Sequence, residues 1–182
     1  MKCALHIHTN FSDGFCTPEE IIQAYLEKGF TCLAITDHSF LLPPNYFRYL
    51  ERLRLKLKDR ALLLLGIEID FEPWQGAHLL EIKGEAEELH ILCHPRAYLL
   101  SPEEVMERVH SSPIPIDAVE ITHRGVYTPE YDVSQITIPK VATDDAHELF
   151  EVGNAWIETD DFTYADEVIR AVKRGEFEVK FA

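Results

Sequence analysis

Short apolar runs alternate with helical patterns along this 182-residue chain. Such alternation predicts a parallel sheet whose strands are connected by helices. An eight-stranded barrel usually takes about 250 residues and at least ~200, so we expect an α/β fold with a trimmed or distorted (β/α) barrel of roughly seven strands. A doubly wound open sheet is the alternative, and both folds place function at the carboxyl ends of the strands. The runs typical of strands cover residues 2–8, 31–36, 61–69, 89–93, 116–121, 138–142 and 155–157.

Two segments carry the same chemistry for starting a helix. Thr17 and Ser101 can each cap a helix, and a Pro follows each of them directly. Glu20 and Glu104 stand three residues after these caps and can complete a capping box. Apolar residues then recur at helical spacing, and Gly29 is expected to end the first of these helices.

Side chains suited to metal binding follow six successive strand patterns. His6 and His8 end the first run, and their i, i+2 spacing puts both imidazoles on one face, about 7 Å apart along the backbone. Asp13 lies in the next loop, beside a glycine that permits a tight turn. Because the carboxyl ends of parallel strands meet at one end of a barrel, we expect these groups to lie together. The other five runs end at Asp37 and His38, at Glu68, at His94, at Glu120 and His123, and at Asp144, Asp145 and His147.

Charge and histidine content point in the same direction. The chain has nine His, and its 32 acidic residues exceed its 17 basic ones, for a formal net charge of −15. An acidic chain lacks the positive footprint that duplex nucleic acid or an anionic membrane requires. Ionisable groups crowded at one barrel mouth are costly to bury unless cations compensate them. The sequence therefore predicts two or three divalent metal ions, and the mixture of imidazole and carboxylate favours Zn, Mn or Fe.

The four cysteines do not suggest a structural zinc site or a disulfide framework, because none forms a Cys-x-x-Cys pair. We interpret Cys3, Cys16, Cys32 and Cys93 as small buried hydrophobic residues. Cys93 directly precedes His94, so it is expected to point to the opposite face of its strand, which argues against a nucleophilic role. No apolar run approaches the length of a membrane helix, and we expect one cytoplasmic domain over residues 1–182.

Five segments together resemble the ordered motifs of the PHP (polymerase and histidinol phosphatase) family. They are Leu-His-Ile-His-Thr-Asn-Phe-Ser-Asp-Gly, Ile-Thr-Asp-His, Gly-Ile-Glu, Cys-His-Pro and Asp-Asp-Ala-His, and they run from residue 5 to residue 147. Each tripeptide alone is weakly specific, but the set in this order is highly specific. The resemblance implies a distorted, TIM-barrel-like (β/α)7 barrel, a dinuclear or trinuclear metal site, and phosphoester hydrolysis.

The resemblance also implies a role for each matching residue. His6, His8 and Asp145 are expected to bind one ion, and Asp13, His38 and His147 a second. Glu68 is the expected bridging carboxylate. His94 and His123 would hold a third ion, and the site is dinuclear if His123 points away. Within this set we assign catalytic roles to Asp13, Glu68 and His147.

Residues outside the metal ligands have more open interpretations. A phosphate needs cationic donors, and Arg96 and Arg124 follow expected ligands closely enough to supply them, although each could instead pair with a surface acid. Asp37 and Asp144 could orient ligand imidazoles. His78 is expected beside the metals rather than on them, and His90 toward the other end of the barrel; Trp74 could stack a base or simply pack.

The leading functional hypothesis is a phosphatase or phosphodiesterase that acts on a small phosphorylated metabolite or nucleotide. Bound metals lower the pKa of water, so a metal-activated hydroxide would be the nucleophile. An exonuclease-like hydrolase of short single-stranded oligonucleotides is an alternative, but the net charge of −15 and the lack of a basic stripe with aromatic residues weigh against it. A non-catalytic metal-binding accessory module is the third hypothesis.

Overall fold

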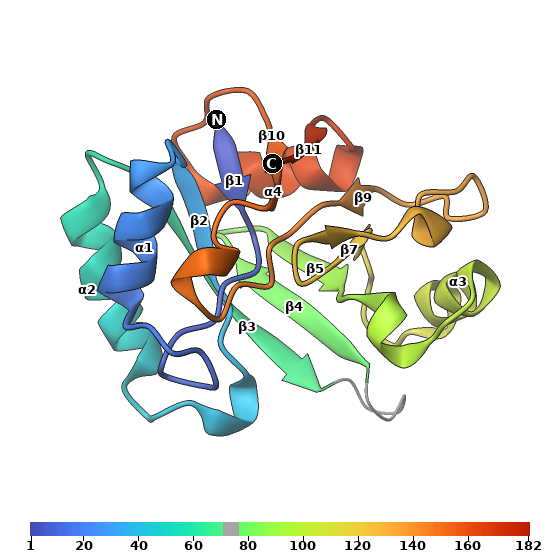
Figure 1. The fold of residues 1–182 in the computed structure, drawn as a ribbon, viewed down its shortest axis with the longest axis horizontal. Coiled ribbons are helices and arrows are strands. Elements are labelled where there is room, and N and C mark those ends of the chain that lie inside the picture. The colour runs from blue at the N-terminus through green and yellow to red at the C-terminus, as the bar shows by residue number, and fades with distance from the viewer. Residues whose placement is uncertain (71–76) are drawn as a thin grey trace.

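The computed structural model describes residues 1–70 and 77–182 and is built on one nine-stranded sheet (Figure 1). The strands follow the order β11-β10-β1-β2-β3-β4-β5-β6-β9, and β7 and β8 form a separate pair. The strands span Lys2–Ala4 (β1), Cys32–Ile35 (β2), Leu62–Asp70 (β3), His78–Lys83 (β4), Glu88–Leu92 (β5), Ala118–Glu120 (β6), Thr122–His123 (β7), Val126–Tyr127 (β8), Lys140–Val141 (β9), Ala155–Glu158 (β10) and Glu178–Phe181 (β11).

The sheet curls into a nearly closed, distorted barrel of seven strands, β1 to β6 and β9. An isolated parallel bridge between Ile7 and Ala146 joins the segments that follow β1 and β9, and the amide of His8 donates to the carbonyl of Ala146 at 2.9 Å. Strands β1, β2 and β3 are parallel, as are β5, β6 and β9, whereas β4 is antiparallel to both neighbours. The predicted distorted barrel is therefore confirmed, and the β3–β4–β5 meander is its distortion.

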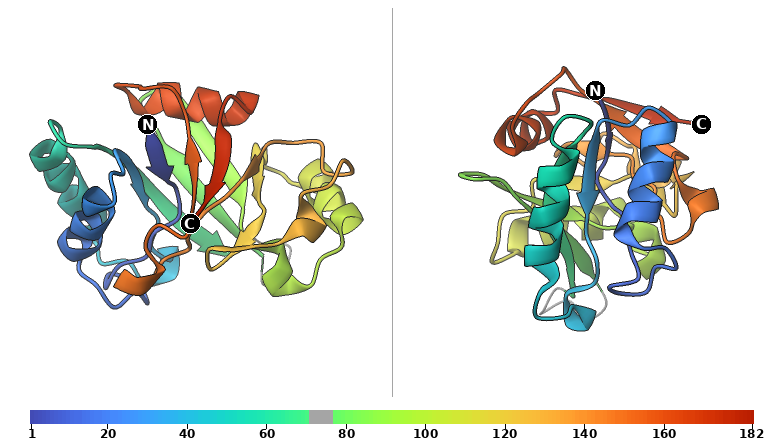
Figure 2. Two further views of the ribbon diagram at one scale, coloured as in Figure 1. Left: turned by 45° about the horizontal axis from the view of Figure 1, so that its top comes forward. Right: turned by 90° about the vertical axis from the view of Figure 1, so that its left-hand side faces the viewer.

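The described part of the chain contains four α-helices around the sheet: α1 (Pro18–Glu27), α2 (Tyr46–Leu57), α3 (Pro102–Ser111) and α4 (Ala165–Arg174). The predicted capping boxes are both present, at the start of α1 with Thr17 and Glu20 and at the start of α3 with Ser101 and Glu104. In Figure 2, α1 and α2 lie next to each other on one side of the barrel and α3 lies on the other. Short 3-10 helices cover Ser39–Leu41, Pro95–Tyr98, Pro129–Tyr131 and Leu149–Glu151.

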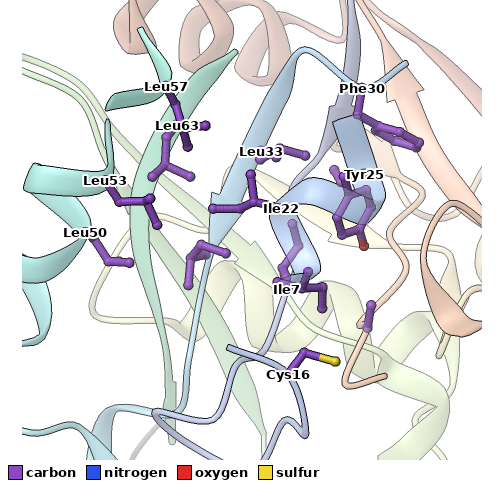
Figure 3. Packing of buried hydrophobic residues seen from close by; sticks show 14 of the residues in the cluster. Ile7, Cys16, Ile22, Tyr25, Phe30, Leu33, Leu50, Leu53, Leu57 and Leu63 are labelled. Atoms are coloured by element: carbon purple, nitrogen blue, oxygen red, sulfur yellow. The ribbon is translucent and has the colours of Figure 1, made fainter. Parts of the chain in front are cut away.

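Apolar side chains divide between layers outside the barrel and a core inside it. One outer cluster packs Ile22 and Tyr25 of α1 and Leu50 of α2 against strands β2 and β3 (Figure 3). A second outer cluster packs α3 against β5 and β6 through Val105 and Met106. Because alternate strand residues face opposite sides, the remaining strand side chains fill the barrel interior.

Helix α4 closes one end of the barrel. Val168, Ile169 and Val172 pack into the interior cluster, and the carboxylate of Asp166 accepts hydrogen bonds from the amides of Glu85, Ala86 and Glu87 in the β4–β5 turn. The helix ends at Arg174 and is capped by Gly175, whose φ of 69° lies in the left-handed region. The opposite end, where the parallel strands terminate, is left for the polar side chains.

Within the described residues, we find no helix that combines the length and the apolar character needed to cross a membrane.

Candidate metal centre

Eight of the nine predicted ligands converge at the carboxyl ends of the parallel strands. Together with Cys93 and His78, these residues form four overlapping groups. Within each group, the potential ligand atoms all lie within 4.8 Å of one another. The groups are His6, Glu68, Cys93 and His94; His8, Asp13, His38 and His147; His6, His8 and Asp145; and His38, Glu68 and His78.

An irregularity after β1 turns His6 and His8 into this cluster. Cys3 and Leu5 belong to the interior core, whereas Ala4 and Ile7 belong to the outer layer. Strict alternation would put residues 3, 5 and 7 on one face, so the chain changes phase between Leu5 and Ile7. This change directs both imidazoles inward, where neither is exposed to solvent.

His94 reaches the centre through an unusual backbone conformation. Leu89, Ile91 and Cys93 face the interior, so regular alternation would send the next side chain outside. Instead the chain turns at His94, whose φ is 25°, and its Nε2 comes within 3.2 Å of the Oε1 atom of Glu68. Positive φ is uncommon outside glycine, and such strained residues cluster at functional sites. The prediction that Cys93 points away from the His94 side is wrong, because both side chains join the same group of ligand atoms.

Glu68 stands at the middle of the histidines, at the end of a long apolar strand. Its carboxylate lies 3.2 Å from His8 Nε2 and 3.2 Å from His38 Nδ1. It also lies 3.5 Å from His6 Nε2 and 2.8 Å from His78 Nδ1. Only 1% of this residue is exposed, and it belongs to two of the four groups. This position is the one that a bridging carboxylate would occupy.

Asp13 approaches the centre from the loop after β1. Its carboxylate oxygens lie 3.4 Å from His8 Nδ1, 3.5 Å from His38 Nε2 and 3.4 Å from His147 Nε2. The loop can fold this closely over the segment after β1 because the next residue is Gly14, where a Cβ would lie 2.8 Å from the backbone of His8.

The ionisable groups at the centre strongly perturb one another. Burial alone lowers the pKa of His6, but the carboxylates of Glu120, Asp145 and Glu68 outweigh it and raise the pKa to about 10. Burial opposes ionisation of Glu68 and Asp145 as well, yet the neighbouring histidines hold both carboxyl pKa values below the usual range. The raised pKa of His6 and the lowered pKa values of the two acids indicate that this cluster favours positive charge beside its carboxylates.

The donor set fits divalent metal ions. Imidazole nitrogen and carboxylate oxygen are the ligands that Zn, Mn and Fe share. Burial lowers the pKa of His38 and His147, which favours the neutral imidazole that a metal requires. In addition, Nδ1 of His94 is buried and has no hydrogen-bond partner among the described residues, although buried polar atoms are normally paired.

Comparison with known proteins identifies the family. The model of the PHP domain matches residues 4–152. The chain belongs to the PHP family. A second model, described as PHP-associated, matches residues 133–177.

Two individual proteins are similar to this PHP chain. DNA polymerase/3'-5' exonuclease PolX from Bacillus subtilis (strain 168) is 34% identical over 82 residues, which cover 40% of this chain and 14% of that protein. The crystal structure of a candidate metal-dependent phosphoesterase from Bifidobacterium adolescentis ATCC 15703 superposes with a TM-score of 0.64. That match covers 97% of this chain and 96% of the other at 14% identity, and it supports the fold.

The predicted residues outside the ligand groups have more varied positions. His123, on β7, has its ring centroid 5.9 Å from that of His94, but it joins none of the four ligand groups of the described residues. Arg124 is paired with Glu151, and Arg96 lies 3.1 Å from the carboxylate of Glu130. Their roles as a third-metal ligand and as phosphate contacts stay predictions.

Asp37 and Asp144 form hydrogen bonds to loops of the PHP barrel instead of orienting imidazoles. Asp37 accepts hydrogen bonds from the backbone and hydroxyl of Thr9 and from the hydroxyl of Ser12. Asp144 accepts from the hydroxyl of Tyr25 at 2.7 Å and from the amides of residues 153–155. The prediction that these two carboxylates orient ligand imidazoles is therefore wrong: among the described residues, their hydrogen bonds go to backbone amides and hydroxyl groups.

His90 lies away from the centre as expected, whereas His78, expected beside the metals rather than on them, joins His38 and Glu68 in one of the four ligand groups. His78 bridges Glu68 at 2.8 Å and Asp70 at 2.9 Å, which places it directly beside the central carboxylate. His90 lies 3.9 Å from both Glu81 and Asp117 and is absent from the four ligand groups. The interpretation of Trp74 concerns a residue outside the described part of the chain.

Glu120 contacts one of the predicted ligand histidines, a position that the sequence did not predict. It is fully buried, and its carboxylate accepts hydrogen bonds at 2.7 Å from Nδ1 of His6, the amide of His94 and the hydroxyl of Thr143. Such a bond fixes the ring orientation of a ligand histidine, so that Nε2 of His6 points into the centre. The signal was available, because Glu120 follows inward-facing Ala118 by two residues in an apolar strand.

Replacing Glu120 with Gln is expected to lower metal affinity by about 10- to 100-fold, the usual effect of losing a carboxylate behind a ligand histidine. The amide keeps the side-chain volume but cannot accept all three hydrogen bonds. Competition with a metal indicator measures the effect, and Glu158→Gln, a change on β10 outside the ligand groups, is the matched control. Equal affinities in both variants would contradict this role.

Proposed function

We propose that this PHP domain is a metal-dependent phosphoester hydrolase that acts on a small phosphorylated metabolite or nucleotide. The observation that carries the proposal is the convergence of four overlapping groups of ligand atoms around one mouth, with Glu68 common to two of them. Neighbouring groups that share a carboxylate are typical of sites with more than one metal ion. The likeness to a candidate metal-dependent phosphoesterase supports the same reaction class.

The residues divide into two holding sets and a shared carboxylate. His6, His8 and Asp145 would hold one ion, and a second set would consist of Asp13, His38 and His147. Glu68 would contact both. Ions held there lower the pKa of a bound water toward neutrality and neutralise charge on the phosphoryl oxygens. Two or three such ions, of Zn, Mn or Fe, fit these donors.

Cationic side chains near the mouth would orient the substrate phosphate. Partial burial lowers the pKa of Arg124, but its partner Glu151 outweighs this effect and raises the pKa, with smaller contributions from the carboxylates of Asp145 and Asp13 at the centre. Its planar guanidinium suits two-point contact with phosphoryl oxygens. We assign Arg124 and Arg96 as contacts of the substrate phosphate, which would compete with Glu151 and Glu130 for these two guanidinium groups.

A covalent mechanism through Cys93 is disfavoured. The thiol is not exposed, and burial together with the nearby carboxylate of Glu68 raises its pKa well above the ordinary value. A nucleophilic cysteine needs a lowered pKa and access to the substrate. Water is therefore the proposed nucleophile.

The experiment is hydrolysis of p-nitrophenyl phosphate and a panel of phosphomonoesters and phosphodiesters by the purified chain. We expect activity with Mn²⁺ or Zn²⁺, its loss after chelation, and its return when the ion is restored. The absence of activity with every divalent metal and every phosphoester would overturn the proposal.

Hydrolysis of short single-stranded oligonucleotides is a second candidate, favoured by a basic row on α2. Residues 46–60 contain six of the 17 basic residues and only two of the 32 acidic ones. This corrects the expectation that the chain has no basic stripe, since Arg48, Arg52 and Lys56 are exposed at four-residue intervals, beside exposed Phe47. Like charges at this spacing weaken a helix, whereas a polyanion would be attracted to them.

A labelled oligonucleotide ladder, assayed beside the phosphomonoesters, separates the two candidates. Stepwise shortening that outpaces phosphomonoester hydrolysis and weakens steeply with salt would favour the oligonucleotide substrate. The partial match to PolX, whose name includes a 3'-5' exonuclease, motivates this arm of the experiment.

A further inference from the structure

One buried thiol, that of Cys93, belongs both to the apolar core and to the candidate metal centre. Cys93 follows β5, has no exposed surface, and faces the barrel interior with Leu89 and Ile91. Its sulfur lies within 4.8 Å of the potential ligand atoms of His6, Glu68 and His94. None of the other cysteines of the described chain belongs to a ligand group.

We infer that Cys93 is a metal ligand, supplying a thiolate to the ion held by Glu68 and His94. This inference rests on the metal centre of the proposed function and extends it by naming the kind of ion. A donor set of nitrogen, oxygen and sulfur selects a thiophilic ion such as Zn²⁺ over Mn²⁺ or Mg²⁺.

The four donor atoms lie close enough together to approach one ion. Zinc binds sulfur at about 2.3 Å and imidazole nitrogen at about 2.0–2.1 Å, so two ligand atoms on one ion lie no more than ~4.4 Å apart. The sulfur and the three other donor atoms of its group all lie within 4.8 Å of one another, so modest side-chain adjustments bring them to that span. A coordinating thiol gives up its proton to solvent as the metal–sulfur bond forms, so no oxidant or reductant is required.

The other contacts of the sulfur leave it available. Its hydrogen bond to the carbonyl of Ile91 is long, at 3.6 Å, and uses the thiol proton that coordination removes. The backbone turn at His94, with a φ of 25°, is what brings two consecutive side chains to the same ion. Cys3 and Cys32, by contrast, are free thiols at neighbouring positions of the parallel strands β1 and β2, and they lie in the interior core outside the ligand groups.

Cobalt substitution tests the inference without substrate. The metal-free native chain is titrated with Co²⁺, for which thiolate ligation produces a sulfur-to-cobalt charge-transfer band in the near ultraviolet. We expect this band in the native protein and in Cys16→Ser, and its loss in Cys93→Ser and Cys93→Ala. The affinity for Zn²⁺ should fall at least about 10-fold in Cys93→Ser, with a smaller change for Mn²⁺.

A cobalt-loaded native protein without the charge-transfer band, or a Cys93→Ser variant that keeps it, would overturn the inference. The native spectrum alone decides the matter if neither variant folds. The result is independent of the phosphoester panel: a missing band with hydrolysis intact removes only the thiolate ligand, whereas a band without hydrolysis removes only the proposed function.

Discussion

Replacing Glu68 with Gln is expected to lower phosphoester hydrolysis by at least about 100-fold and to reduce the number of bound metal ions. The substitution keeps the volume but removes the negative charge that faces His8 and His38 at 3.2 Å and His78 at 2.8 Å. A neutral amide bridges cations poorly, so both holding sets should lose affinity. Elemental analysis of the purified variant and the phosphoester assay measure the two effects.

Glu81→Gln provides the matched control for that experiment. Glu81 lies on the neighbouring strand β4, where it pairs with Lys83 at 2.8 Å, and it belongs to none of the ligand groups. Its variant should keep native metal content and activity. A Glu68→Gln protein with the metal content and activity of this control would rule out a bridging role for Glu68.

In the metal-free protein, the thermal stability is expected to fall as the pH rises from 6.5 to 10. Burial and the three carboxylates around His6 give a net pKa of about 10, against an ordinary value of 6.5. A raised pKa stabilises the folded state fully below pH 6.5, and this stabilisation is lost as the pH rises through the folded value. The lowered carboxyl pKa values of Glu68 and Asp145 act oppositely and cost stability only as the pH falls through the acidic range.

Metal ions replace those protons, so the loaded protein should resist alkaline pH. An ion present at 100 times its dissociation constant stabilises the fold by about 2.7 kcal/mol, roughly 5–11 °C in Tm for a chain of this size. Calorimetry with and without chelator at pH 6.5 and pH 9 measures the difference, which should be larger at pH 9. His90→Gln should keep this response and His6→Gln should weaken it; a chelated native protein whose Tm does not fall with pH would contradict the explanation.

Much of the barrel follows from local patterns. The capping boxes at Thr17 and Ser101 begin α1 and α3 as predicted, because cap chemistry depends on neighbouring residues alone. The long apolar run before Glu68 forms the central strand β3. Strand β4 departs from the strand–helix alternation, because it pairs antiparallel with β3 and β5, its neighbours in sequence, with no helix between them in the described part of the chain.

The candidate ligands were predictable as residue types at strand ends, but their directions were not. Regular alternation would have turned His94 outward, and the turn at that residue reverses the outcome while leaving Cys93 inside. The roles of Asp37 and Asp144 were misjudged for a related reason. Adjacency in sequence suggested contact with imidazoles, whereas the fold brings each carboxylate to backbone amides of other segments.

The sequence by itself determined the kind of fold, the end of the barrel that carries the chemistry, and the family, because strand–helix alternation and ordered motifs are local properties of the chain. Only the tertiary structure decided which donors share an ion, that Glu120 holds His6, and that a thiol joins the centre. The physical reason is that a change of one residue in strand phase, or one backbone turn, redirects a side chain by half a revolution. Such changes are set by contacts between segments far apart in the sequence, as the bridge between Ile7 and Ala146 illustrates.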